Sequence, residues 1–253
     1  MRIALFADSF GTSRNSLNVA WYNLLAEKLN AKLDIFALGG YPTFLCYKKF
    51  CNVYENYDQC IFLVSDYAKY TKPVNLETKQ GVKFNEHYIS GLRNCEIMLE
   101  SMDLIDNDVE LLNMIKVWFL ICDDEFLQTV QDLIIQDLLN KKPNTIVLPV
   151  SIQTAGVKHC MSEKWYDKLN IDKNWSFWEF HKVMARSLQN ECDVLTFPEY
   201  LEIPDKISAH LTFEANKVLA NDLYEYIVNG TTLKLPEYIK HDHEINYYYE
   251  VKE

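Results

Sequence analysis

The sequence predicts an α/β protein in which helices cover both faces of a five-stranded parallel sheet, forming a three-layer sandwich. Short apolar runs alternate with longer segments of helical periodicity, and polar turn signals separate the two kinds of segment. Strands that alternate with helices form parallel sheets, because each return to the same end of the sheet needs a helical crossover. The 253 residues are enough for one such domain with an insertion.

The five strands are expected where apolar runs are short and bounded by turn residues, at 3–7, 32–38, 59–65, 145–150 and 193–197. Helical spacing predicts helices at 17–29, 47–57, 91–140 with a break near Asn107, 176–188 and 212–228. Ser176 and Glu179 have the spacing of a capping box, and Gly230 follows the last helix as a C-terminal glycine would.

Two segments lack a clear period. Residues 68–90 are mostly polar and are predicted to form a long loop, the kind of segment that often serves as a lid. Residues 151–174 are also irregular. We therefore expect one domain at 1–230 with a helical and loop insertion at 68–142, followed by a charged, tyrosine-rich tail at 231–253.

Charge and cysteine content narrow the choice of partners. The net charge of −11 disfavours a nucleic-acid partner, because phosphate binding needs a basic surface. No apolar stretch approaches the roughly 20 residues that span a membrane, and the N-terminus does not resemble a secretory signal. Seven scattered cysteines without a CxxC pair predict neither a disulfide framework nor a zinc site. We expect a cytoplasmic protein that binds neither membrane nor nucleic acid.

Residues suited to chemistry follow the first three predicted strands: Ser9, Gly40 and Ser65. The carboxyl ends of parallel strands meet at one edge of the sheet, where ligands bind in α/β proteins. Backbone N–H groups and a helix N-terminus at this edge can stabilise an oxyanion, and Ser9 becomes a nucleophile if a base takes its proton. The alternative interpretation is that Ser9 only opens a turn.

His210 stands immediately before the last predicted helix. From that place it can reach back to the end of the first strand, and histidine is the most frequent general base. A capping or packing histidine is the alternative interpretation.

Four segments carry a resemblance to a known family, in the same order along the chain: 3–10 (IALFADSF), 21–26 (WYNLLA), 57–65 (YDQCIFLVS) and 210–216 (HLTFEAN). They resemble the SGNH/GDSL hydrolases, whose first motif is a strand followed by G-D-S and whose last is D-x-x-H before the terminal helix. The resemblance implies the SGNH hydrolase fold, a flavodoxin-like three-layer sandwich with a five-stranded parallel sheet.

The resemblance also implies residue roles. Ser9 would be the nucleophile and His210 the general base. The backbone N–H groups of Ser9 and Gly40 would form part of the oxyanion hole, with Gly39 as the alternative to Gly40.

The third motif of the family is altered in this chain. The family has G-x-N-D after the third strand, whereas residues 64–69 here read VSDYAK, so the asparagine that donates to the oxyanion is missing. Loss of one such donor costs about 100- to 1000-fold in rate. Ser65, Tyr67 and Lys69 are the candidate substitutes.

The first and last motifs also differ from the family. Ala7 replaces the glycine of the first motif, which is tolerable if the backbone there is not left-handed. Ile207 occupies the D-x-x-H position, and Asp205 lies five residues before His210. Asp205 could orient the imidazole if the loop bulges; the alternative is a Ser–His dyad with a backbone carbonyl in that role.

The leading hypothesis is therefore a serine esterase or carbohydrate O-deacetylase that acts through an acyl-enzyme on a small-molecule or carbohydrate ester. It implies no metal and no organic cofactor. Residues 241–244 (HDHE) look metal-like but are better explained as a solvated tail. A second set could line a sugar cleft, although core packing is favoured: Trp165, Tyr166, Trp175, Trp178 and Phe180.

The rival hypothesis is a catalytically reduced SGNH-fold domain with a structural or binding role. Related-looking domains with the pattern H-L-T/S-x-E-x-N occur in tailed-phage proteins, so a virion component, virion-associated rather than purely cytoplasmic, fits this alternative. Homo-oligomer formation or virion assembly is left open. A nucleotide-binding domain is disfavoured, because neither GxGxxG nor a GxxxxGK[ST] loop is present.

Overall fold

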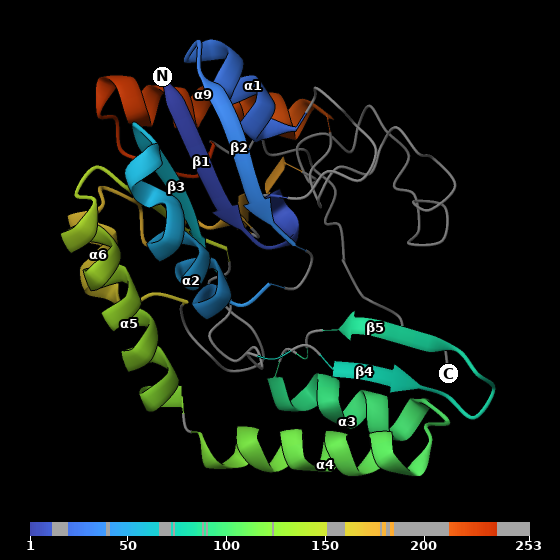
Figure 1. The fold of residues 1–253 in the computed structure, drawn as a ribbon. Helices are drawn as coiled ribbons and strands as arrows, with labels where there is room; N and C mark the ends of the chain where they lie inside the picture. Colours follow the sequence, from blue (N-terminus) through green and yellow to red (C-terminus); the bar gives the residue numbers. More distant parts are fainter. Residues whose placement is uncertain are drawn as a thin grey trace, which may run out of the picture.

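The computed structural model describes residues 1–11, 20–38, 41–65, 72, 74–87, 89, 91–122, 124–150, 160–177, 179–180, 183–184 and 213–236. These residues form an α/β fold with a four-stranded parallel sheet flanked by helices (Figure 1).

The sheet has the strand order β2-β1-β3-β6, and all three neighbouring pairs are parallel. Its members are β1 (Arg2–Ala7), β2 (Lys32–Ala37), β3 (Gln59–Val64) and β6 (Ile146–Pro149). The prediction of a parallel sheet is confirmed, and these four strands lie within one or two residues of their expected bounds. The fifth expected strand, at 193–197, lies outside the described residues.

The burial of the strands explains why they could be recognised in the sequence as apolar runs. All residues of β6, and all but the first of β1 and β3, are buried, because helices cover both faces of a parallel sheet. β2 forms an edge of the described sheet and is only half-buried. Phe6 on β1 lies beside Phe36 on β2 and Phe62 on β3, and the rings of Phe6 and Phe62 also pack against Phe50.

Two helical layers enclose the sheet (Figure 1). On one face α1 (Trp21–Lys28) packs against α9 (Phe213–Asn229). On the other face α2 (Thr43–Val53) packs against β1, β3 and α5 (Asp124–Lys141). Short turns η1 (Ser9–Gly11) and η2 (Tyr54–Asn56) and the helix α6 (Glu163–Lys168) complete this part.

The aromatic residues after position 160 belong to the core. Trp165, Tyr166, Trp175 and Phe180 are buried, and Phe177 contacts Trp175, Trp21 and Phe10. The preference for core over a sugar cleft is thereby confirmed for these four, whereas Trp178 lies outside the described residues. The predicted cap is also confirmed, since the Glu179 N–H donates to Ser176 Oγ over 3.1 Å.

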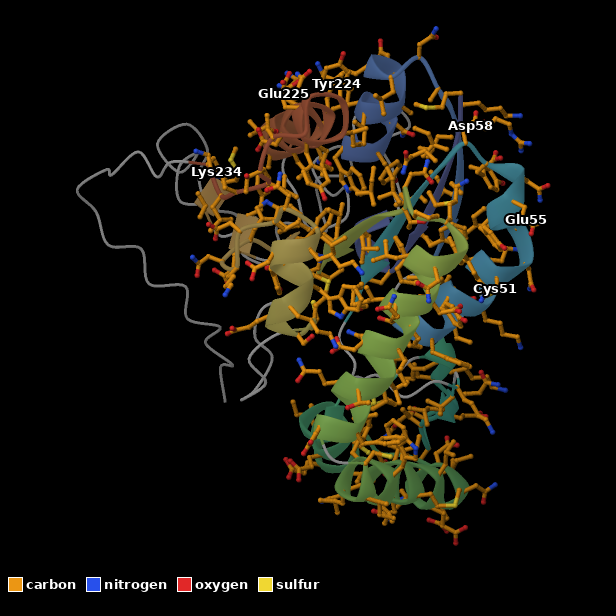
Figure 2. All side chains as sticks on the ribbon, turned by 90° about the vertical axis from the view of Figure 1, so that its left-hand side faces the viewer. Cys51, Glu55, Asp58, Tyr224, Glu225 and Lys234 are labelled. Carbon is orange, nitrogen blue, oxygen red and sulfur yellow. The ribbon has the colours of Figure 1, made fainter. Side chains whose placement is uncertain are left out.

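A second unit lies at one end of the molecule, away from α1 and α9 (Figures 1 and 2). It comprises β4 (Val74–Glu77), β5 (Lys83–His87), α3 (Gly91–Ser101) and α4 (Asp106–Ile121). Its own small core is separate from that of the sheet and consists of Val74, Leu76, Ile89, Cys95, Leu104, Leu112 and Ile115.

The prediction of a long loop at 68–90 is wrong for residues 74–87, which form the antiparallel hairpin β4–β5. Val74 and Leu76 alternate with more exposed residues, as the half-buried strand of a hairpin requires. Gly81 has a φ of +81°, a conformation that favours glycine in the turn between the strands.

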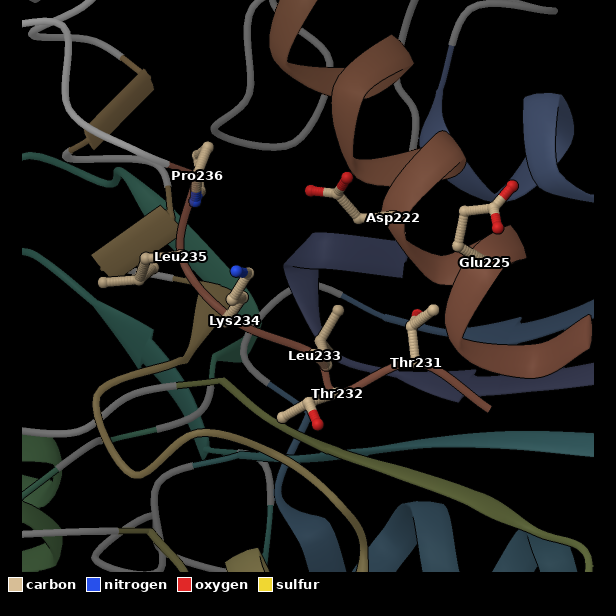
Figure 3. Close-up of a pocket in the computed structure, with 8 residues that line it drawn as sticks. All are labelled: Asp222, Glu225, Thr231, Thr232, Leu233, Lys234, Leu235 and Pro236. Carbon is tan, nitrogen blue, oxygen red and sulfur yellow. The ribbon is translucent and has the colours of Figure 1, made fainter. Parts of the chain in front are cut away.

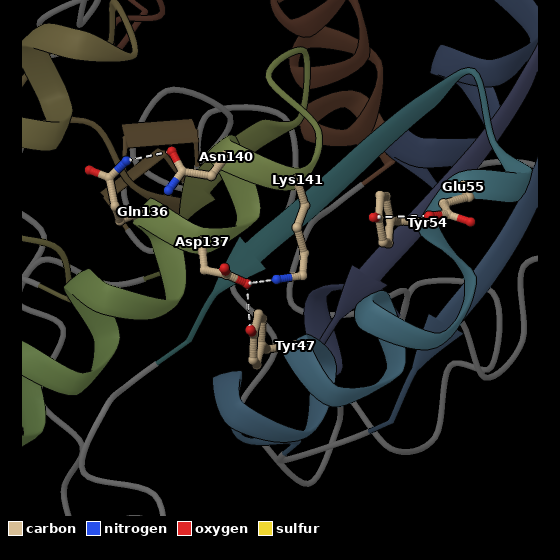
Figure 4. Close-up of polar contacts among 7 residues, drawn as sticks. All are labelled: Tyr47, Tyr54, Glu55, Gln136, Asp137, Asn140 and Lys141. Carbon is tan, nitrogen blue, oxygen red and sulfur yellow. Dashed lines mark hydrogen bonds and ion pairs between the residues drawn. The ribbon is translucent and has the colours of Figure 1, made fainter.

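The helix α5 lies within the 68–142 segment but packs on the sheet. Its residues Ile134, Ile135 and Leu138 belong to the core of the sheet. The Tyr47 hydroxyl on α2 donates to Asp137 Oδ2 (2.5 Å), which also pairs with Lys141, while Gln136–Asn140 and Tyr54–Glu55 are local contacts (Figure 4). The hydrogen bonds from Lys141 and Tyr47 lower the pKa of Asp137. Among the described helices, none is long and apolar enough to cross a membrane.

Candidate functional site

The turn that contains Ser9 is built on the carboxyl end of the central strand β1. Asp8 follows β1 and is 2% exposed; its Oδ1 accepts the Phe10 N–H over 3.1 Å. The Gly11 N–H donates to the Asp8 carbonyl over 3.0 Å and closes the turn η1. Ser9 is therefore held in a tight turn whose first residue is a buried acid, a local structure that aspartate favours.

Gly11 lets this turn lie directly on the sheet. A Cβ atom at Gly11 would lie 2.4 Å from the Ala7 Cβ and 3.1 Å from the Ala37 Cβ, so any side chain would push the turn off the ends of β1 and β2. Ala7 is the last residue of β1 and is not among the described residues with a positive φ. The backbone at Ala7 is therefore not left-handed, which is the condition under which alanine can replace the glycine of the first SGNH/GDSL motif.

Ser65 joins the end of β3 to the Ser9 turn. Its hydroxyl donates to Asp8 Oδ2 over 2.6 Å, and its N–H donates to Thr43 Oγ1 over 3.0 Å. The Ser65 carbonyl accepts from Gln131 Nε2 (2.9 Å), and the same amide reaches the Cys160 carbonyl. All of these side chains are buried, so this hydrogen-bond network holds the residues that follow β1 and β3 in fixed positions relative to each other.

The start of α9 is fastened to the same turn through α1. The Asn216 side-chain oxygen accepts the Trp21 N–H over 2.8 Å, which caps the N-terminus of α1 from 195 positions away. The Trp21 indole N–H in turn donates to the Phe10 carbonyl over 3.0 Å. Phe213, the first residue of α9, thus lies one helical turn from Asn216, which is linked to the Ser9 turn through Trp21.

The structure describes only part of the site that the sequence predicted. It places the backbone of Ser9 in η1 and brings Ser65 to the same rim through Asp8. Gly40, Asp205 and His210 lie outside the described residues, as do Gly39, Tyr67, Lys69 and the side chain of Ser9.

The sequence analysis did not select four of the residues that hold the rim: Asp8, Thr43, Gln131 and Asn216. Gln131 had a visible signal, because it lies at helical spacing from Ile134, Ile135 and Leu138 and is therefore a polar residue on an apolar face. A polar residue in such a place needs a buried partner. Asn216 stands in the last of the four resembling segments, but its partner on α1 could not be read from the sequence.

A pocket of about 210 Å³ lies elsewhere, between the second half of α9 and the chain that follows it (Figure 3). Asp222, Glu225 and Lys234 contribute its charged groups. Burial raises the pKa of Asp222 to about 6. This pocket shares no lining residue with the Ser9 turn. Within the described part of the chain, no group of three or more His, Cys, Asp or Glu residues could hold a metal ion.

Comparison with known proteins finds a similarity in structure but none in sequence. No protein-family model matches the chain, and no curated protein matches it in sequence. Among solved structures, the chain is similar to a protein from Desulfitobacterium hafniense DCB-2 that is described as lipolytic and of the G-D-S-L family. The match has a TM-score of 0.36 and 12% sequence identity, and covers 87% of this chain and 95% of that chain. A likeness at this level identifies no catalytic residue and no substrate.

Proposed function

We propose that the protein is a serine hydrolase that cleaves an ester through an acyl-enzyme, with Ser9 as the nucleophile and His210 as the general base. One observation carries the proposal: the buried turn with Ser9 lies at the carboxyl end of the central strand and is tied by hydrogen bonds to the first turns of α9. Ligands of open α/β sheets bind at this edge.

The connection to α9 bears on His210 because the chain between them is short. His210 precedes Phe213, the first residue of α9, by three positions, which an extended chain covers in about 10 Å. Since Asn216 contacts Trp21 and Trp21 contacts Phe10, the start of α9 is anchored near the Ser9 turn. We therefore infer that the His210 imidazole can reach the Ser9 hydroxyl.

The proposed reaction has two halves. His210 takes the proton of Ser9 while the Ser9 oxygen attacks the ester carbonyl, and the backbone N–H groups of Ser9 and Gly40 stabilise the oxyanion. The alcohol leaves with that proton, and a water molecule, activated by the same imidazole, then releases the acid and regenerates the serine. Asp205 or a backbone carbonyl orients His210.

Asp8 and Ser65 have a positioning role in this proposal. Both carboxylate oxygens of Asp8 accept hydrogen bonds, from the Phe10 N–H and from the Ser65 hydroxyl. In this arrangement the single hydroxyl proton of Ser65 is directed at Asp8 and not at a substrate. Ser65 therefore serves the oxyanion less well than a side-chain amide would, and the backbone donors carry more of that task.

The substrate class that fits best is a simple acyl or acetyl ester. The hypothesis of a carbohydrate ester loses its main support, because the aromatic residues that suggested a sugar cleft are buried in the core: Trp165, Tyr166, Trp175 and Phe180. We therefore place an O-acetyl group on a carbohydrate second to a small ester.

Labelling with a fluorophosphonate probe tests the assignment of the nucleophile. The wild-type protein should be labelled and should hydrolyse p-nitrophenyl acetate, whereas Ser9→Ala should lose labelling and at least about 10⁴-fold in kcat. His210→Ala should fall to a similar level. Ser13→Ala and His241→Ala are matched controls and should remain active. A fully folded wild-type protein with neither labelling nor hydrolysis would falsify the enzymatic proposal.

The altered rim of β3 favours a second candidate function. No asparagine occurs among the five residues directly after β3, 65–69 (SDYAK), and Ser65 donates its hydroxyl proton to Asp8. A catalytically reduced domain with a structural or binding role, such as a virion component, accounts for this loss without requiring turnover. The same labelling experiment decides between the two candidates.

A further inference from the structure

The pocket beside the second half of α9 contains a carboxylate without a partner. Asp222 is partly buried and points from α9 toward the chain at 233–236 (Figure 3). Among the described residues, none forms a hydrogen bond or an ion pair with this carboxylate, and burial is what raises its pKa. Because a charge that has lost water and gained no partner is costly, a positive group beside Asp222 would be favourable.

The two other charged groups of the pocket do not fill this role. The Glu225 carboxylate accepts a hydrogen bond from Asn229 Nδ2 on the same helix, and in Figure 3 it points away from the carboxylate of Asp222. Lys234 lines the pocket but is exposed, and it forms no ion pair with Asp222 in the described part of the chain. With Asp222 ionised, two negative groups and one positive group line the pocket, so a ligand with one positive charge would neutralise it.

The chain that faces α9 across the pocket is fixed by hydrogen bonds. The Leu233 N–H donates to the Asn170 carbonyl over 3.1 Å, and the Leu233 carbonyl accepts the Asp172 N–H over 2.8 Å. On α9, the Tyr226 hydroxyl donates to the Leu169 carbonyl over 2.5 Å, which fastens the helix to the same stretch of chain. Both walls are therefore held in place without a ligand, and a preformed pocket loses little freedom when it binds one.

The size and the lining of the pocket suit a small ligand with an apolar part. Its volume of about 210 Å³ is below the roughly 300–1,000 Å³ of pockets that hold drug-sized ligands. Leu233, Leu235 and Pro236 supply apolar atoms, and Thr231 and Thr232 supply hydroxyl groups. An inorganic cation would leave the apolar atoms unused, whereas a short alkyl chain with a charged end would contact both kinds of group.

We propose that this pocket binds a small primary alkylammonium ion, whose charged group pairs with Asp222 and whose alkyl chain contacts Leu233 and Leu235. An ammonium group donates three hydrogen bonds, and the Thr231 hydroxyl offers a second acceptor beside the carboxylate. The pocket shares no lining residue with the turn that holds Ser9. The proposal therefore does not depend on ester hydrolysis, and either can fail without the other.

The pairing makes binding depend on pH. Asp222 attracts a cation only when ionised, and burial raises its pKa to about 6. Affinity should be constant above about pH 7 and should fall about tenfold for each pH unit well below 6. Glu225 and Lys234 are the other ionisable groups that line the pocket. The nearby Tyr226 has a pKa raised to about 12 by burial and stays neutral over this range.

Titration of the ¹⁵N-labelled full chain with n-butylammonium at about pH 8 and constant ionic strength, followed by NMR amide shifts, tests the proposal. Wild type should show saturable shifts at residues 231–234, with a Kd of about 1–100 mM. Asp222→Asn should raise the Kd about tenfold or more, and a thermal melt should show that this variant is folded. The matched control Glu225→Gln should change the Kd by less than about threefold. Lys234→Met removes a like charge and should lower it.

Two isosteric probes separate the charge of the ligand from its alkyl chain. Butyrate and 1-butanol have chains of similar length without the positive charge, and both should bind more weakly than n-butylammonium. Four results would each overturn the proposal: no saturable shifts with n-butylammonium, binding that Asp222→Asn leaves intact, tighter binding of butyrate, and an affinity that is the same at about pH 5 as at about pH 8.

Discussion

The rim of the sheet and the outer unit of β4, β5, α3 and α4 use their side chains in opposite ways. At the rim, the polar groups of Asp8, Ser65, Thr43 and Gln131 are buried and bonded to one another. The outer unit has a core of seven side chains and leaves apolar side chains of similar size, such as Ile121, in water. Buried polar networks fix the geometry of the groups that they join. The rim thus has a fixed polar geometry, whereas the outer unit exposes apolar side chains on one face of a helix.

Truncation of one core residue in each unit should give the largest difference in stability and hydrogen exchange between the two regions. Phe62→Ala, in the middle of the sheet, should lower the free energy of unfolding by about 4 kcal/mol, and Leu112→Ala in the outer unit by about 3 kcal/mol. Urea unfolding measures both. Hydrogen exchange should rise throughout the chain for Phe62→Ala but mainly in α3 and α4 for Leu112→Ala. Equal exchange patterns would mean that the two cores unfold as one.

Each region also contains a buried aspartate, and the two aspartates should contribute different amounts to the free energy of unfolding. Asp8 accepts from Phe10 and Ser65, while Asp108 on α4 accepts from the Glu77 N–H. Asp8→Asn should cost about 2 kcal/mol, because the asparagine side chain has one accepting oxygen where Asp8 uses two, and Asp108→Asn should cost about 1 kcal/mol. A double-mutant cycle of Asp8→Asn with Ser65→Ala should show coupling. Additive effects would argue against a shared network.

Glycine substitution sharpens the contrast between a crowded turn and an open one. Gly11→Ala should cost about 2 kcal/mol because its Cβ would collide with Ala7. Gly81→Ala, whose Cβ meets nothing within 4 Å, should cost about 1 kcal/mol through its positive φ alone. Thermal unfolding of the two variants measures the order. A reversed order would show that the turn at Gly11 can move away from the sheet.

Asp222 provides a carboxyl whose pKa is raised by burial, in contrast to the hydrogen-bonded Asp8. Its pKa rises from 3.8 to about 6, so the folded protein holds this proton more tightly than the unfolded chain. Stability should therefore fall as pH increases from about 4 to about 6 and stay lower above that. Asp222→Asn should remove this slope and stabilise the protein at pH 7 by about 1 kcal/mol, after allowance for solvent screening. Urea titrations at several pH values, with Glu225→Gln as the exposed control, measure the effect.

Buried parallel strands could be predicted because their sequences are continuous apolar runs, as in residues 60–64. The hairpin at 74–87 could not, since β4 is only four residues long and β5 is largely polar. The first helix was expected from 17 but α1 begins at Trp21. Its N-cap residue, Ala20, has no side chain that can accept a hydrogen bond, and Asn216 accepts the first helical N–H instead; no local pattern can reveal an acceptor from the other end of the chain.

The candidate site shows the same limit. Ser9 and Ser65 were identifiable because both follow apolar strands, and the structure brings them to one rim. The intermediary between them, Asp8, looked like part of a motif and gave no indication that it would bond to β3. Gln131 lies 66 positions from the carbonyl that it contacts, and only the packing of α5 on the sheet brings the two together.

The cap on α1 has a consequence for how the protein is made. Because the N-terminus is synthesised first, the turn at Ser9 and the beginning of α1 leave the ribosome long before residue 216 is synthesised. Until then the Trp21 N–H lacks its acceptor from α9, and the scaffold around the turn is incomplete. Any chemistry at Ser9 would consequently be withheld from truncated nascent chains and acquired only when translation has passed α9.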